Sequence, residues 1–137
     1  MLEVREVREN DDLSSFKEAI YGNGFFPVRL VDEPYEKDIH AVAVKDGKVV
    51  AFGCIRGFDE DWPDKTVGVC VHPEHRQKGY ARAIMTFLEV VAREKGLKRL
   101  RLHVNDGNVP ARLLYHKLGY VFAGRREDGE AIYYKEL

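Results

Sequence analysis

The segment from Thr66 to Lys95 constrains the fold more than any other part of the chain. Thr66–Val71 is a short β-branched run, which favours a strand, and Pro73 blocks its continuation. A long amphipathic helix is predicted over Gly79–Lys95, and Gly96 follows where a helix C-cap belongs. The apolar face of this helix consists of Ala81, Ile84, Met85, Leu88, Val91 and Ala92. A buried strand, a tight turn and a helix therefore stand in direct succession.

The remaining sequence predicts further strands and helices around this unit. Strands are expected over Leu2–Val7, Ile39–Val44, Val49–Ile55, Lys98–Val104, Tyr120–Gly124 and Ala131–Lys135. Helices are expected over Asp11–Ile20 and Asn108–Leu118, and a loop with a short helix over residues 25–38. The Asp46-Gly47 pair joins two of the strands as a hairpin.

This order of elements predicts an α/β (α+β) fold in a single domain covering residues 1–137. We expect a mixed, mostly antiparallel sheet of six to seven strands with about four helices. The strand–helix–strand unit over residues 66–104 should form a right-handed parallel crossover, which places one parallel pair inside the sheet.

Composition excludes several classes of function. The chain carries 22 Lys+Arg against 23 Asp+Glu, and this near-neutral balance argues against nucleic-acid binding. Cys54 and Cys70 lie in apolar runs without metal-ligand spacing, so no metal is expected. The charged N-terminus does not resemble a signal peptide, and no apolar run reaches the roughly 20 residues of a membrane span. We therefore expect a cytoplasmic protein with no membrane partner.

The turn between Val71 and Arg82 has the features of an anion site. The N-terminus of a helix presents unpaired N–H groups and the positive end of the helix dipole. Gly79 permits close backbone approach, and Ala81 keeps the first helical turn slim. Three cations lie on the turn, with no acidic residue among them: Arg76, Lys78 and Arg82.

The sequence Val71-x-Pro73-x-x-Arg76-x-x-Gly79-x-Ala81 resembles the cofactor motif of the GNAT superfamily of N-acetyltransferases. A second segment, Asn108 to Tyr120, resembles the late helix of that superfamily through Asn108, Ala111, Leu114, Tyr115, Lys117, Gly119 and Tyr120. The order of elements agrees over nearly the whole chain. The resemblance identifies no individual member.

The resemblance implies acetyl-CoA as cosubstrate. The turn would hold its pyrophosphate through Arg76, Gln77, Lys78, Gly79, Tyr80, Ala81 and Arg82. The strand before the turn would bulge and splay from its parallel neighbour, and its backbone at Val69 and Val71 would pair with the pantetheine arm like an added strand. The side chains of these two valines should face the core.

The resemblance also places Tyr115 at the position of the general acid, although a tyrosine on an apolar helix face also reads as core. Asn108 would cap the late helix, bind the cofactor arm, or do both. In several members a Glu or His in the strand before the turn acts as base, but Lys65 and Val67 occupy the matching positions. The base therefore stays unassigned among Asp64, Asp59, Glu60, Asp61, His103 and water alone.

The sequence leaves the acceptor open between a small-molecule amine and a peptide amine. The acidic loop from Asp59 to Asp64, with Trp62 in it, could attract a cationic amine or be a solvated loop. The aromatic residues Tyr21, Phe25, Phe26 and Tyr35 could line the acceptor pocket or close the core. A CoA-binding sensor without turnover is the competing function, and a homodimer paired through late strands stays open.

Overall fold

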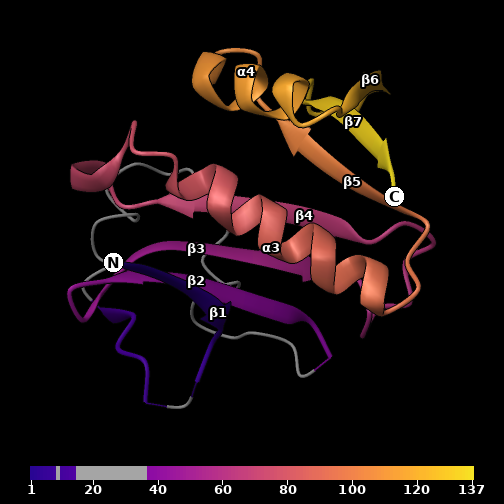
Figure 1. Cartoon of the computed structure of the whole chain (residues 1–137). Helices are drawn as coiled ribbons and strands as arrows, with labels where there is room; N and C mark the ends of the chain where they lie inside the picture. The colour runs from indigo at the N-terminus through magenta and orange to yellow at the C-terminus, as the bar shows by residue number, and fades with distance from the viewer. Residues whose placement is uncertain (9, 15–36) are drawn as a thin grey trace.

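The computed structural model describes residues 1–8, 10–14 and 37–137, and within them seven strands form one sheet in the order β1-β2-β3-β4-β5-β7-β6 (Figure 1). The strands are β1 (Leu2–Glu6), β2 (Ile39–Lys45), β3 (Lys48–Arg56), β4 (Thr66–Val71), β5 (Arg99–Val104), β6 (Val121–Arg125) and β7 (Ala131–Glu136). The helices are the 3₁₀ turn η1 (Pro73–His75), α3 (Tyr80–Glu94) and α4 (Val109–Lys117). The predicted fold class is confirmed.

The sheet contains one parallel pair, β4 with β5, and it is narrow. Thr66 pairs with Arg101, and this is the single parallel pairing in the described part of the chain. Beyond it the two strands separate, as Figure 1 shows. We call the region between β4 residues 67–71 and β5 residues 102–104 the splay. The expected splayed parallel pair is therefore present.

The expected bulge in the strand before the turn is absent. β4 pairs with β3 in an unbroken antiparallel register from Ala51–Val71 to Arg56–Thr66. The pairing of β4 with β3 is therefore regular up to Val71, although only Thr66 pairs with β5.

Helix α3 covers one face of the β2–β4 half of the sheet (Figure 1). Its apolar side chains Ile84, Met85 and Leu88 are fully buried in the main core. Gly53 on β3 makes this close packing feasible, because a Cβ there would overlap the Ile84 side chain. The face opposite α3 carries a smaller buried cluster formed by Val42, Phe52, Cys54 and Cys70.

A buried carboxylate connects α3 to the other half of the sheet. Glu89 is 5% exposed, and its Oε1 accepts a hydrogen bond from Lys135 Nζ of β7 at 2.6 Å. Its Oε2 accepts a hydrogen bond from the Tyr120 hydroxyl at 3.2 Å. This network bridges the halves that β4 and β5 join through one residue pair.

The predicted strands and the two long helices lie within one or two residues of their observed bounds. The helix expected over Asp11–Ile20 and the segment 25–38 fall largely outside the described residues, and the aromatic residues Tyr21, Phe25, Phe26 and Tyr35 lie wholly outside them. None of the helices in the described ranges has the length and apolarity needed to cross a membrane.

Candidate functional site

The turn after β4 begins with a short 3₁₀ helix. His72 precedes η1, and its Nδ1 accepts the Glu74 backbone N–H at 3.1 Å. Pro73 in the first position of η1 ends the strand, since a proline offers no N–H to continue the ladder. The chain then passes through exposed residues 76–79 before α3 begins.

Two residues of this exposed stretch have left-handed backbone conformations. Gln77 has a φ of 62°, and Gly79, the N-cap of α3, has a φ of 82°. No side chain caps the helix, and a Cβ built on Gly79 would have no atom within 4 Å. The N–H groups of the first turn of α3 are therefore accessible to an anion, as the motif predicts.

The cations of the turn surround this helix start. Arg76, Lys78 and Arg82 are exposed, and Arg76 Nε also lies 3.4 Å from the Val71 carbonyl oxygen. Tyr80 differs from the expectation for a binding side chain, because it is 7% exposed and belongs to the core. Only its backbone remains as a contact for a bound phosphate.

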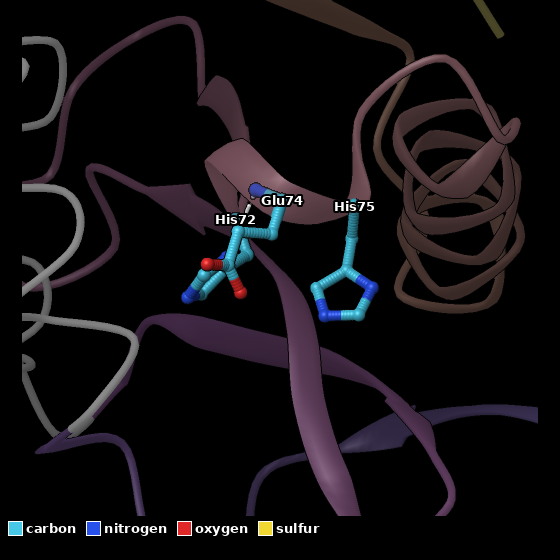
Figure 2. A group of neighbouring side chains, drawn as sticks. All are labelled: His72, Glu74 and His75. Carbon is cyan, nitrogen blue, oxygen red and sulfur yellow. Dashed lines mark hydrogen bonds between the residues drawn. The ribbon is translucent and has the colours of Figure 1, made fainter.

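Figure 2 shows His72, Glu74 and His75 projecting to the same side of the turn. Their ligand atoms lie within 4.8 Å of one another, so the cluster resembles a metal site. However, His72 Nδ1 accepts the Glu74 N–H, so in the neutral imidazole Nε2 carries the hydrogen. Metal binding at either nitrogen of His72 would break this bond or require an imidazolate, and we assign no metal here.

The backbone of β4 directs groups without a strand partner toward the splay, although Arg76 Nε approaches the Val71 carbonyl oxygen. The Lys65 C=O accepts an N–H from β5, whereas the His72 N–H donates to a carbonyl of β3. Because strand residues alternate in the direction of their backbone groups, Val69 and Val71 direct theirs toward β5, which has already diverged. Their half-buried side chains pack against the main core, as expected from the sequence.

Tyr115 lies on α4 and is buried in the main core, against which Val69 and Val71 also pack. Its ring centroid is 5.9 Å from that of Tyr120. Burial raises the pKa of Tyr115 to about 12, so the phenol is protonated at neutral pH. The core interpretation and the general-acid interpretation of this tyrosine are therefore compatible.

Asn108 caps α4. Its Oδ1 accepts the Ala111 backbone N–H at 3.3 Å, and Pro110 occupies the first turn, where no N–H partner is needed. The carboxamide nitrogen is not used by this capping bond.

Two candidate bases of the acidic loop, Asp64 and Asp59, have structural partners. Asp64 forms a two-pronged ion pair with Arg99, at 2.9 and 3.0 Å, which lowers the pKa of this carboxyl group. Asp59 accepts the Lys37 backbone N–H at 3.1 Å. Lys65 secures the loop by donating to the Trp62 carbonyl at 2.6 Å.

His103 is a poor base for a different reason. It is half-buried on β5, and burial followed by the charges of Arg126, Arg101 and Arg56 lowers its pKa to about 4. Arg101 Nε lies 2.9 Å from His103 Nε2, and Arg126 Nη1 lies 2.7 Å from His103 Nδ1. Sequence patterns gave no signal for the contact with Arg126, which lies 23 residues away on another element.

A buried acid that the sequence did not suggest is Asp38, which precedes β2 and is 8% exposed. Burial raises the pKa of this carboxyl group, and Glu60 and Asp59 add to the effect. Since Ile39 pairs with Ile55 of β3, Asp38 lies two strands from β4. Two strand spacings are about 10 Å, which is too far for direct proton transfer at the splay.

Known proteins resemble this chain in both sequence and fold. Streptothricin acetyltransferase of Streptomyces lavendulae is 41% identical over 54 residues, which are 39% of this chain and 29% of that protein. The catalytic subunit of the N-terminal acetyltransferase B complex of Arabidopsis thaliana is 35% identical over 75 residues, which are 53% of this chain and 42% of that protein. The chain thus matches well under half the length of either relative.

Two solved structures illustrate the likeness of fold. PaiA N-acetyltransferase from Thermoplasma acidophilum, in complex with coenzyme A, has a TM-score of 0.77 at 16% identity, covering 100% of this chain and 99% of that one. YncA from Salmonella typhimurium, with its cofactor acetyl-CoA, has a TM-score of 0.81 at 21% identity, covering 100% and 94%.

The family model for "Acetyltransferase (GNAT) family" matches residues 7–120. This range contains β4, the uncapped basic start of α3 and all of α4. The motif, the splayed strands and the family match all agree, and the chain belongs to the GNAT acetyltransferase family.

Proposed function

We propose that this chain is an N-acetyltransferase that moves the acetyl group of acetyl-CoA to a primary amine within a ternary complex. The observation that carries the proposal is the combination of an uncapped, basic helix start with neighbouring β4 backbone groups that have no strand partner on the β5 side. The first suits a pyrophosphate and the second suits an amide-containing arm. Coenzyme A and acetyl-CoA in the related structures support this choice of cosubstrate.

The reaction follows from the groups around the splay. The amine nitrogen attacks the thioester carbonyl carbon, and the C–N bond forms before the C–S bond breaks. Backbone N–H groups of β4 at Val69 and Val71 are the nearest candidates to stabilise the oxyanion. The Tyr115 hydroxyl donates to the departing sulfur, and the proton released by the amine passes to water.

The first test is the substitution Tyr115→Phe. It removes the hydroxyl and keeps the ring in the core, so turnover should fall about 100-fold. The dissociation constant of acetyl-CoA, measured by calorimetry, should change by less than about twofold, because the turn that binds the pyrophosphate is untouched. Unchanged turnover would remove Tyr115 from the mechanism.

The second candidate function is a CoA-binding sensor without turnover. The acidic loop favours this function because two of its candidate bases already have partners. Asp64 pairs with Arg99, and Asp59 accepts the Lys37 backbone N–H. A thermal-shift titration with acetyl-CoA, CoA and ATP tests the binding that both functions share. Thiol release with a panel of amines then separates them, because a sensor would bind acetyl-CoA and release no thiol with any amine.

A further inference from the structure

A group of cationic side chains lies on the face of the sheet opposite α3, next to the splay. Leu100, Leu102 and Val104 of β5 are buried in the core beneath α3. Because strand side chains alternate between faces, Arg101 and His103 project from the opposite face. They are joined there by Arg126, which belongs to the loop between β6 and β7.

These three side chains contain more hydrogen-bond donors than acceptors. Arg101 approaches one ring nitrogen of His103 at 2.9 Å, and Arg126 approaches the other at 2.7 Å. With its pKa lowered to about 4, His103 is neutral at pH 7 and has one lone pair and one N–H. Only one guanidinium can therefore donate to it, and the other faces an N–H.

Neighbouring acids do not supply the missing acceptor. Asp128 and Glu130 form ion pairs with Arg126 at 3.7 and 3.9 Å, but these distances are too long for hydrogen bonds. Asp64 is occupied by Arg99. Arg101 forms no ion pair with any of the described residues. The positive charge of Arg56 adds to the same surroundings, since it also contributes to lowering the pKa of His103.

The group formed by Arg101, His103 and Arg126 lies next to the splay, where the proposed reaction would take place. Thr66–Arg101 is the last strand pairing before β4 and β5 separate. His103 lies two residues further along β5, where β4 is paired with β3 but no longer with β5. Tyr115 and α3 belong to the other face of the sheet. The guanidinium groups of Arg101 and Arg126 therefore lie beside the splay on the face opposite α3.

We propose that Arg101, His103 and Arg126 form a binding site for a carboxylate of the acceptor, so that the preferred acceptor is an amine that also carries a carboxylate group. This inference rests on the proposed acetyltransferase function. A carboxylate supplies the acceptor oxygens that the two guanidinium groups lack, and guanidinium and carboxylate match in geometry. The site thus selects an acceptor that carries a carboxylate, in contrast to the purely cationic amine that the acidic loop suggests.

The test uses pairs of amines in which a carboxylate is replaced by its amide: glycine and glycinamide, β-alanine and β-alaninamide, and 4-aminobutyrate and 4-aminobutanamide, each at a pH that leaves the same fraction of neutral amine in both members. Thiol release should give a kcat/KM at least about tenfold higher for the carboxylate member of one pair or more. 2-Aminoethyl phosphate shows whether the site prefers a phosphate. Equal or better turnover of the amides in every pair, or preference for the phosphate over all carboxylates, would overturn the proposal.

Substitutions at the two arginines test whether the preference for the carboxylate amine depends on this site. Arg101→Gln and Arg126→Gln should each remove about tenfold of kcat/KM for the carboxylate amine and leave that for the amide unchanged. The control is Arg125→Gln, since Arg125 pairs with Asp106 at 2.8 Å and not with His103. Equal losses for both amines would indicate a structural effect and contradict a carboxylate site.

A binding measurement keeps this proposal separate from the proposed function. The imidazole of His103 is followed by NMR in ¹³C-histidine-labelled protein, with His103→Gln to assign the signal. An added negative charge favours the imidazolium, so β-alanine should raise the pKa of His103 and β-alaninamide should not. This result without thiol release would refute the acetyltransferase function alone. No difference between the two compounds would refute the carboxylate site.

Discussion

At the residue scale, burial shifts two pKa values in opposite directions and leaves both groups uncharged. The pKa of Tyr115 rises to about 12, and that of His103 falls to about 4. In each case removal from water disfavours the charged form, which is the anion of a phenol and the cation of an imidazole. The site therefore presents a neutral proton donor on one face of the sheet and a neutral imidazole between guanidinium groups on the other.

The Tyr115 shift predicts a loss of stability at high pH. An unfolded tyrosine loses its proton near pH 10, whereas folded Tyr115 keeps it to about pH 12. The unfolded state thus binds fewer protons between these values, and the free energy of unfolding falls as pH rises from 10 to 12. Urea unfolding at pH 9, 10 and 11 should show a shallower fall for Tyr115→Phe than for the parent chain. If the free energy of unfolding falls equally with pH in both proteins, the raised pKa of Tyr115 is refuted.

The sequence predicted single residues well where a local motif was enough. Asn108 was recognised as a cap because a cap acts on residues within one helical turn, and Gly79 because glycine readily adopts a left-handed backbone. The contact of His103 with Arg126 arises from the pairing of β5, β7 and β6 in space, so no local pattern could reveal it.

At the element scale, the start of α3 combines a helix dipole, free N–H groups and exposed cations. The substitution Arg82→Ala should weaken acetyl-CoA binding about tenfold, the loss of one charge-assisted contact to phosphate. Calorimetric titration gives the dissociation constant. Lys95→Ala, at the opposite end of the helix, is the matched control and should leave it unchanged. An equal effect of both variants would point to overall charge and not to a phosphate contact.

The elements themselves were predictable because their periodicity is strong. The amphipathic pattern of α3 and the alternation in β5 fixed both elements to within one or two residues. The absent bulge shows the limit of this approach. The bulge is implied by the resemblance to the superfamily. The register of β4, however, depends on hydrogen bonds to β3, and the sequence of β4 alone does not encode them.

At the scale of the whole molecule, two half-sheets meet at Thr66 and Arg101 and are bridged by the Glu89 network. Glu89→Gln removes the charge that Lys135 faces in a largely buried position. The substitution should lower the free energy of unfolding by about 2 kcal/mol. This loss is smaller than that for breaking a fully buried ion pair, because the Lys135 side chain is 19% exposed.

Chemical denaturation, followed by one spectroscopic probe in each half of the sheet, measures this change in the free energy of unfolding. Glu94→Gln, an exposed position on the same helix, is the control and should stay within about 0.5 kcal/mol of the parent. Equal stability of Glu89→Gln and Glu94→Gln would show that the bridge between the halves is not stabilising.

The narrow join at Thr66 and Arg101 also has a consequence for local unfolding. Separation of β5, β7 and β6 from β4 would break no other strand pairing in the described chain, but it would break the Asp64–Arg99 ion pair and the Glu89 network. Amide hydrogens of β4 and β5 near the join should therefore exchange through partial opening, at a lower free energy than global unfolding. A molecule that contacts both halves would suppress this opening, so slowed exchange at the join would report occupancy of the splay.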